Sequence, residues 1–308
     1  MVDTHQHDGP QLLCVAGFRG VIKVIDTVQQ MLYMTLSGHG ADIYDLKFSS
    51  TDSSLCISAS KDESVRLWNV TSGTCVGIFA GHEGHRDSVL SVAWHPLGNA
   101  IASASMDNTV KLWSLKEGTN VYSALQASHG MTAKEWNVST KTAPTGLFFK
   151  TASEQVPYFS SNKIHLNYVD CVQFLGDSLI LSKSVNDCIV LWKPNLVLPV
   201  IHGRQSHTIP SNDVIALWEF HIKHCQVWFI RFDTNANGNL LAVGNQKGQI
   251  KVWDMDRVGN AQEENGFPLL KHATCDSTIR MVSFSPDGKS LVATCDDATV
   301  WKWDAKFD

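Results

Sequence analysis

The sequence predicts an all-β fold, a β-propeller built from repeated four-stranded blades, and three observations support this prediction. One phrase recurs along the chain: an apolar strand, a polar turn that usually contains Asp, and a second strand that ends near Trp. The first two gaps between the closing positions of this phrase are 43 and 45 residues, within the period of a propeller blade. In five copies a further segment of alternating apolar and polar residues precedes the phrase, which is typical of a strand with one buried face.

The repeats follow one another from residue 12 onward in units of unequal length. With their leading strands, the units are 12–26, 42–70, 88–115, 168–194, 226–255 and 278–306. Their closing positions are Ile25, Trp68, Trp113, Trp192, Trp253 and Trp303. The later gaps, of 79, 61 and 50 residues, indicate inserted segments, and we interpret residues 116–163 and 195–222 as long loops. We expect a disordered tail over residues 1–10 and one propeller domain over residues 11–308.

Counting the expected strands gives four complete blades and two incomplete ones. The first blade has strands over 12–26 and an outer strand near 30–37, but no innermost strand. The last blade ends at Trp303 without an outer strand, and residues 1–10 are too few and too polar to supply both missing strands. An open sheet edge is therefore expected. Either the chain is an N-terminally truncated product or a partner closes the ring, and we favour truncation.

Composition narrows the classes of function. Of the 308 residues, 44% are apolar and 18% are charged, as in a folded globular protein. The net charge of −5 argues against nucleic acid as the main partner, and no apolar run approaches the roughly 20 residues of a membrane helix. The eight cysteines are scattered without a C-x-x-C pair, which favours buried free thiols in a reducing compartment over zinc or disulfide frameworks. We therefore expect a soluble intracellular protein with no metal, no cofactor and no membrane partner.

The recurring phrase resembles the WD repeat, and one copy contains a full set of the structural residues of that repeat. In WD-repeat proteins, a His that follows Gly binds the turn Asp, which is linked in turn to a Ser or Thr and to the Trp indole. Here His39, Asp62, Ser58 and Trp68 match this set. The residue types also match a catalytic Ser/His/Asp triad, but we assign them to blade stability.

Longer stretches resemble one particular family. They include "GHGADIYDLKFSS", "EGHRD", "HLNYVDCV", "QVWFIRF" and "CDDATVWKWD", and the match runs in order over essentially the whole chain from Leu12. Together they resemble the Polycomb WD-repeat family that comprises EED, extra sex combs and FIE. The resemblance implies a seven-bladed propeller within Polycomb repressive complex 2, a nuclear complex that silences genes. One face would hold a helix of the SET-domain histone methyltransferase, and the other would read trimethyl-lysine on the histone H3 tail.

The resemblance also implies residues for the methyl-lysine site. A trimethyl-ammonium group donates no hydrogen bond and is recognised by aromatic faces. Two aromatic cage positions of the family match Trp228 and Phe229, whereas the other two belong to the family's N-terminal region, which has no counterpart here. The family pattern places four further residues near the same end of the channel: Tyr168, Asp170, Arg231 and Arg280.

These assignments have simpler alternatives. Trp228 and Phe229 are adjacent, and adjacent residues of a strand point to opposite faces, so they share one wall only if the strand is just starting. Otherwise one or both rings are ordinary blade core. Lone Arg and Asp residues at the top of a blade also serve as solvated surface or as salt bridges between blades. Tyr44 sits at an equivalent strand start, and we consider it as a partial replacement for a missing cage wall.

Three functions are weighed against one another. The first is a non-catalytic scaffold and methyl-lysine reader of a Polycomb methyltransferase complex, which acts in the nucleus. The second is a generic WD-repeat adaptor, such as a ubiquitin-ligase substrate receptor or a signalling scaffold, and it leaves "HLNYVDCV" and "EGHRD" unexplained. The third is an enzyme, for which the sequence offers no nucleophile–base pair, metal motif or phosphate loop. We favour the first.

Overall fold

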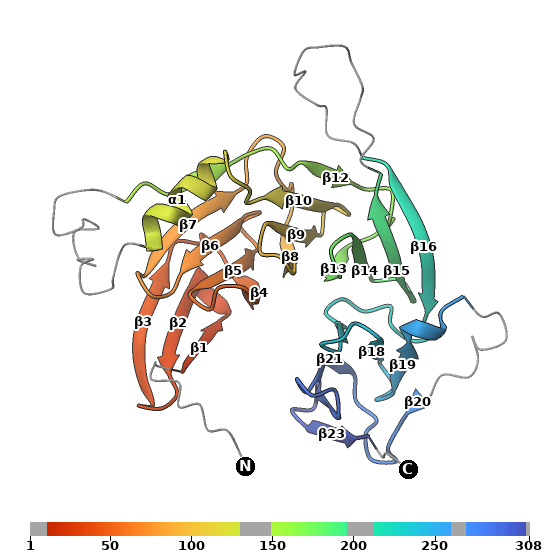
Figure 1. Ribbon diagram of the computed structural model, residues 1–308. Helices are drawn as coiled ribbons and strands as arrows, with labels where there is room; N and C mark the ends of the chain where they lie inside the picture. Colours follow the sequence, from red (N-terminus) through yellow and green to blue (C-terminus); the bar gives the residue numbers. More distant parts are fainter. Residues whose placement is uncertain (1–10, 130–148, 196–211, 260–268, 306–308) are drawn as a thin grey trace, which may run out of the picture. The chain divides into compact units, whose positions relative to one another are not determined.

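Strands account for nearly all the regular structure of the protein (Figure 1). The computed structural model describes residues 11–129, 149–195, 212–259 and 269–305. Within these ranges 23 strands form six sheets, accompanied by one α-helix and two short 3-10 helices. The tail expected over residues 1–10 lies outside the described residues. The chain divides into two compact units: the first runs up to Val89 and includes Ser114–Val156, and the second comprises Leu90–Trp113 and continues from Pro157.

The first sheet of the first unit has three antiparallel strands. They are β1 (Leu12–Ala16), β2 (Val21–Asp26) and β3 (Met31–Ser37), in the order β1-β2-β3. Ile22, Val24 and Leu36 are fully or almost fully buried and pack in one cluster with Trp68 of the following sheet. The strand count made from the sequence is confirmed for this blade: the described residues supply its outer strand but no innermost one.

The second sheet of the first unit contains a complete blade and one added strand. Its strands are β4 (Ile43–Phe48), β5 (Leu55–Ser60), β6 (Val65–Asn69), β7 (Thr74–Phe79) and β11 (Ala152–Glu154), in the order β11-β7-β6-β5-β4. β4 to β7 are antiparallel neighbours, as the repeat predicts. β11 pairs in parallel with β7, so it extends the outer edge of this blade.

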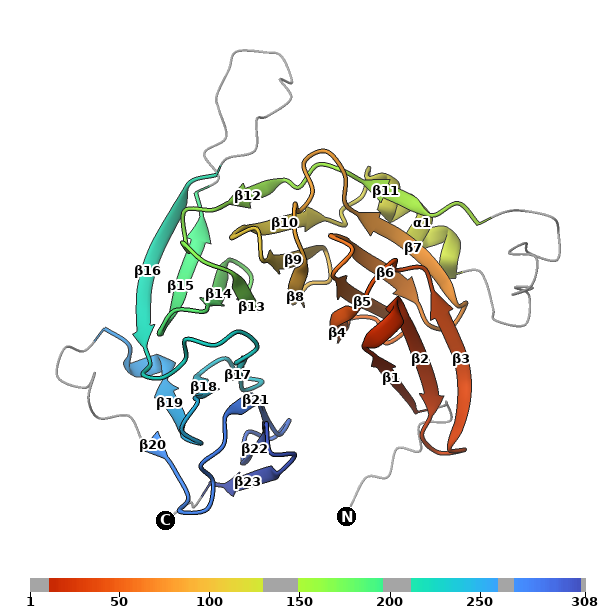
Figure 2. The same cartoon turned by 180° about the vertical axis from the view of Figure 1, so that it is seen from behind.

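The expectation that residues 116–163 form a long loop is wrong for the part of this insert that the structure describes. The insert contains the helix α1 (Asn120–His129), the strand β11 and the strand β12 (Phe159–Ser161). α1 lies beside β7 in both views, and Figure 2 shows β11 next to β7 as well (Figures 1 and 2). Val121 of α1 is fully buried, and a Cβ at Gly77 of β7 would lie only 3.0 Å from its Cγ1, so glycine lets the helix approach closely. The predicted loop "TAKEWNVSTKTAPTG" falls outside the described residues.

The second unit contains four sheets. The first has β8 (Val89–Trp94), β9 (Ala100–Ser105), β10 (Val110–Ser114) and β12 (Phe159–Ser161); the second has β13 (Val169–Leu175), β14 (Leu179–Ser184), β15 (Cys188–Pro194) and β16 (Val214–His221). The third has β17 (Phe232–Thr234), β18 (Leu240–Gly244), β19 (Ile250–Asp254) and β20 (Leu269–Leu270); the fourth has β21 (Ile279–Phe284), β22 (Ser290–Cys295) and β23 (Val300–Asp304). The predicted total of four complete and two incomplete blades is confirmed over the described residues.

Two expectations are corrected in this unit. β16 is an eight-residue strand within the insert over residues 195–222, which we interpreted as a loop. The leading strand expected in the unit 226–255 begins only at Phe232, because the chain makes a turn at Trp228 and Phe229. This turn determines how the two aromatic rings are presented.

The cores lie between neighbouring sheets. Trp68, Trp113 and Trp192 are almost completely buried, as expected for the closing positions of the repeat. All eight cysteines are free and five of them are buried, in agreement with the spacing argument. The described part of the chain has no helix whose length and hydropathy suit a membrane span.

Candidate functional site

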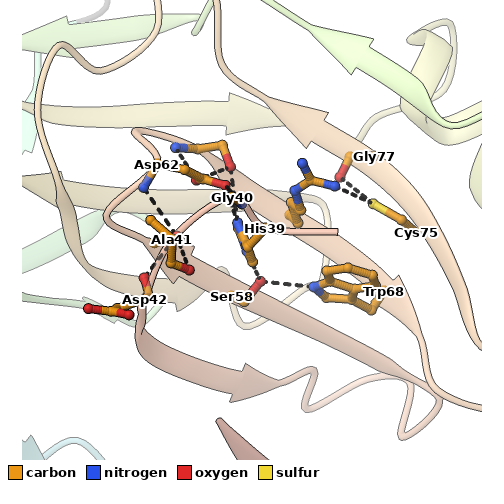
Figure 3. A network of polar contacts seen from close by, with 12 residues as sticks. His39, Gly40, Ala41, Asp42, Ser58, Asp62, Trp68, Cys75 and Gly77 are labelled. Carbon is orange, nitrogen blue, oxygen red and sulfur yellow. Dashed lines mark hydrogen bonds and ion pairs between the residues drawn. The ribbon is translucent and has the colours of Figure 1, made fainter. Parts of the chain in front are cut away.

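The residues assigned to blade stability form one hydrogen-bonded chain in the first unit (Figure 3). His39 Nδ1 lies 2.9 Å from Asp62 Oδ2, His39 Nε2 lies 2.6 Å from Ser58 Oγ, and Trp68 Nε1 donates to Ser58 Oγ at 2.8 Å. A carboxylate only accepts, so Nδ1 carries the imidazole proton and Nε2 accepts from the Ser58 hydroxyl. The Ser58 hydroxyl thus donates to His39 and accepts from Trp68, and its side chain is fully buried. This geometry supports a structural role and offers no accessible nucleophile.

The pKa shifts of His39 and Asp62 favour a neutral His39. Burial lowers the pKa of His39, although the neighbouring Asp62 carboxylate acts in the opposite direction. Burial opposes ionisation of Asp62, but hydrogen bonds from His39, Ser64 and the Gly40 backbone outweigh it and hold the pKa of that carboxyl well below its usual range. The ionised Asp62 and the neutral imidazole are therefore the favoured pair.

The second unit holds the six residues that the resemblance places near the channel. Asp170 of β13 and Arg280 of β21 occupy equivalent positions in their two sheets, because the register of strand pairing shifts at each of them. Such a bulge redirects the side chain at the start of a strand. Tyr44 of β4 occupies the corresponding shift in the first unit.

Trp228 and Phe229 lie in a turn and not in a strand. Phe229 has a φ of 58°, in the left-handed region that side chains other than glycine rarely adopt. The turn places both rings on one side: their centroids are 5.0 Å apart and their planes differ by 29°. The concern that adjacent residues face opposite ways therefore does not apply. Trp228 is 41% exposed, so the stacked pair presents an aromatic surface to solvent.

The two rings form a platform and not two walls of a cage. A trimethyl-ammonium group binds within about 6 Å of a ring centroid on its open face. Rings stacked at 5.0 Å leave no space between them for such a group. A ligand cation must therefore approach the exposed part of Trp228, with Phe229 as backing.

The peptide group that joins these two residues is held at both ends. The carbonyl oxygen of Trp228 accepts a hydrogen bond from Arg280 Nη1 at 2.7 Å. The N–H of the same peptide group, on Phe229, donates to the Asp170 carboxylate. Arg280 is itself fixed by two parallel hydrogen bonds to Asp296, of 2.7 and 2.8 Å, which is the strong bidentate geometry.

Asp170 is paired with a lysine that the sequence reasoning missed. Lys183 Nζ lies 3.2 and 3.3 Å from the two Asp170 oxygens and 3.0 Å from the Ser184 carbonyl oxygen, and both charged side chains are completely buried. Burial raises the pKa of Asp170, and the positive charges of Lys183 and Arg231 partly offset that rise. The available signal was a Lys inside the otherwise apolar and hydroxylated strand "LILSKS".

Burial separates the candidate residues into two groups. Asp170 is fully buried and Arg231 is 7% exposed, so in this arrangement they support the turn and do not reach solvent. Arg231 Nη2 donates to the Leu90 carbonyl at 2.7 Å, and its guanidinium carbon lies 5.5 Å from the Phe229 ring centroid. Tyr168 is 43% exposed, two residues before Asp170, and its ring takes no part in the contacts that link the other five.

The sequence of the chain is similar to a family of known proteins. The family "WD domain, G-beta repeat" matches residues 30–69, 73–114 and 268–304. "Polycomb protein esc" of Drosophila virilis is 39% identical over 298 residues, which cover 96% of this chain and 66% of the relative. "Polycomb group protein FIE1" of Oryza sativa subsp. japonica is 40% identical over 306 residues, which cover 96% of this chain and 72% of the relative. The chain belongs to the ESC/FIE/EED family of Polycomb WD-repeat proteins.

The family resemblance and the all-β WD40 propeller fold predicted from the sequence are thus confirmed. This Polycomb family member spans just under two thirds of the length of the esc relatives. Its fold matches a chain in the "Crystal structure of the Chaetomium Thermophilum polycomb repressive complex 2 (PRC2)" with a TM-score of 0.74. The match covers 96% of this chain and 79% of that one, at 23% sequence identity, and supports the fold.

One group of side chains in this Polycomb family member has the donor types of a metal site. Cys188, Glu219 and His221, on the outer strands β15 and β16, place their ligand atoms within 4.8 Å of one another. Burial and the Glu219 charge raise the pKa of the Cys188 thiol to about 11, so the neutral thiol prevails at neutral pH. A metal ion binds the thiolate form of cysteine, so binding here would first have to displace the Cys188 proton. These three residues are therefore a poor metal site.

Proposed function

We propose that this chain is a non-catalytic scaffold and regulatory subunit of Polycomb repressive complex 2 in the nucleus. In this role it binds the SET-domain histone methyltransferase and reads trimethyl-lysine on histone H3 tails, which promotes repressive histone methylation. Family membership supports the scaffold role, since the curated relatives carry Polycomb names. The observation that supports the reader role is the solvent-exposed Trp228 ring stacked on Phe229.

The chemistry of this platform suits a quaternary ammonium ligand. Such a group has no N–H, so it cannot donate a hydrogen bond to a carboxylate or carbonyl oxygen and is attracted to it only by charge. The face of an indole attracts the group by cation–π interaction. Each well-placed ring contributes about 0.5–2 kcal/mol. With one exposed ring pair among the described residues, we expect weak binding, with a Kd in the range of about 0.1–1 mM.

The reader role is tested with three histone H3 peptides that differ at one lysine. The peptides carry trimethyl-lysine, unmodified lysine, or a neutral analogue in which carbon replaces the quaternary nitrogen. Calorimetry or NMR titration should give measurable affinity for the first peptide only, because the neutral analogue keeps the shape and loses the charge. Equal binding of the trimethylated and neutral peptides would exclude recognition by an aromatic face.

The scaffold role is tested by capturing the tagged protein from nuclear extract and identifying its partners by mass spectrometry. Recovery of a SET-domain histone methyltransferase supports the proposal. Recovery of ubiquitin-ligase or signalling components in its place would favour the generic adaptor weighed from the sequence. A non-catalytic subunit should also show no histone methylation activity of its own when it is assayed without the methyltransferase.

A further inference from the structure

We infer that the buried pair Lys183–Asp170 is a positioning device that fixes the orientation of the Trp228–Phe229 platform. The inference rests on the proposed reader function for its biological meaning, but its structural content can be tested separately. On this view Asp170, Lys183 and Arg280 act through the turn and do not bind the histone peptide directly.

The first step is that one peptide plane sets the direction of both rings. Trp228 and Phe229 flank a single peptide group, whose C=O and N–H point in opposite directions. The C=O accepts from Arg280 at 2.7 Å and the N–H donates to Asp170. A rotation of this plane would break both hydrogen bonds at once and would change ψ of Trp228 and φ of Phe229, the angles that define the turn in which the two rings stack.

The second step is that the turn needs such support. Phe229 adopts a φ of 58°, a conformation that is unfavourable for a residue with a Cβ and that persists only where the surroundings impose it. The Arg231 guanidinium carbon also lies over the ring of Phe229, 5.5 Å from its centroid, which helps to hold that ring. The backbone hydrogen bond from Arg231 N–H to the Arg280 carbonyl, at 2.8 Å, anchors the residues just after the turn.

The third step is the need for Lys183. Asp170 is completely buried, and a buried carboxyl group without a positive partner takes up a proton. A protonated carboxyl accepts a backbone N–H less strongly than a carboxylate does. Lys183 lies against both Asp170 oxygens, at 3.2 and 3.3 Å, and so keeps this acceptor charged. Its third hydrogen bond, to the Ser184 carbonyl at 3.0 Å, fixes the ammonium group in place.

The test compares variants that keep the fold and remove the acceptor. Replacing Lys183 alone would leave a lone buried carboxyl, so the main variant is the double substitution Asp170→Leu with Lys183→Met, which exchanges the ion pair for apolar groups of similar size. The matched control is Lys111→Met, a second buried lysine of the same unit, which donates to Ser160 Oγ at 2.8 Å. A milder arm is Asp296→Asn, which loosens Arg280 from the exposed side.

Two readouts separate the inference from the proposed function. In protein labelled with 5-fluorotryptophan, the signal of Trp228 is assigned among the ten tryptophans by its loss in Trp228→Phe. The double variant should shift or broaden this ¹⁹F signal, and Asp296→Asn should do so to a smaller degree. Lys111→Met should leave it unchanged. Affinity for the trimethyl-lysine peptide should fall about tenfold in the double variant.

The outcomes are decisive in both directions. An unchanged Trp228 signal in a folded double variant would overturn the inference, whatever the affinity. A moved signal with lost affinity supports it. If the unmodified protein binds no peptide, the reader function fails, and the ¹⁹F comparison still decides whether the ion pair positions the turn.

Discussion

Trp192 donates its indole N–H to the hydroxyl of Ser182 across 2.9 Å. The same oxygen lies 2.7 Å from His165 Nε2. One serine therefore joins a tryptophan of β15 to a histidine of the loop that precedes β13. Ser58 does the same for Trp68 and His39 in the first unit. Around His165, however, burial and the nearby Lys183 charge lower the histidine pKa to about 4.

The first prediction concerns the pH dependence of stability. His165 takes up a proton near pH 6.5 in the unfolded chain and near pH 4 in the folded one, so the unfolded state binds more protons between these values. The neutral His165 therefore contributes about 3 kcal/mol to the free energy of unfolding. This contribution is fully present above pH 6.5 and is lost as the pH falls toward 4. His165→Gln should remove this part of the slope in urea unfolding measured from pH 7 to 4.5. The matched variant His221→Gln, at an exposed histidine, should keep it; parallel curves for wild type and His165→Gln would refute the assignment.

The second prediction concerns the hydrogen-bonded chain of the first unit. Ser58→Ala removes the shared oxygen and leaves both the Trp68 indole N–H and His39 Nε2 buried without a partner. We expect a loss of about 2–4 kcal/mol in the free energy of unfolding, measured by urea denaturation. Ser153→Ala, at an exposed serine of β11, should change stability by less than about 0.5 kcal/mol. A loss of similar size in both variants would argue against the network.

The third prediction concerns the contact between the last two sheets. A Cβ on Gly244 of β18 would lie 2.2 Å from Ile279 Cγ2 and 2.9 Å from the Ile279 carbonyl oxygen. Gly244→Ala should therefore force β21 away and cost about 3 kcal/mol in thermal or urea unfolding. Gly40→Ala is the control, since a Cβ there would meet only side-chain atoms of Asp62, at 3.8 and 3.9 Å, an ordinary van der Waals distance. Tolerance of Ala at Gly244 would mean that the two sheets pack more loosely than described.

The fourth prediction concerns the exposed ring of the platform. Trp228→Ala should reduce affinity for the trimethyl-lysine peptide about tenfold, because it removes the aromatic face open to solvent. Trp228→Phe keeps a smaller aromatic face and should lose about threefold. NMR titration can measure both. Full affinity in Trp228→Ala, with the trimethylated peptide still preferred, would place the binding site elsewhere.

The repeated strands were predictable from the sequence because burial enforces their pattern. In β5 and β9 every residue is buried, and the closing tryptophans Trp68 and Trp113 fix the period between blades. The incomplete first and last blades followed from the same count. Where the pattern was strong, local sequence and final packing agreed.

The elements that were not predicted, β16, β11 and α1, have few buried positions and therefore no clear burial pattern in the sequence. β16 is exposed or half-buried at seven of its eight positions, so no alternation marks it as a strand. β11 has three residues and owes its existence to pairing with β7, far away in the sequence. α1 buries only Val121 and Ser128, too few to produce a helical period. Each of these elements depends on partners that a single stretch of sequence does not reveal.

The candidate site was predictable as a set of residue types but not as an arrangement. "QVWFIRF" reads as a strand because its apolar residues suit a buried edge, yet the positive φ of Phe229 breaks it into a turn. The pairing of Asp170 with Lys183 joins two strands, and the grip of Arg280 on Trp228 spans 52 residues. The first contact requires neighbouring strands of one blade to pair, and the second requires two separate blades to come together.

The parallel strand β11 has a consequence for how the protein is made. A ribosome releases β8, β9 and β10, which belong largely to the second unit, before it releases the segment that completes the first. Until Glu154 emerges, the outer edge of β7 has no neighbouring strand, and a bare strand edge invites pairing with other chains. The nascent first unit thus passes through a stage with an unprotected edge, and a chain that ends at a nonsense codon between residues 114 and 151 would keep that edge exposed and be prone to aggregation.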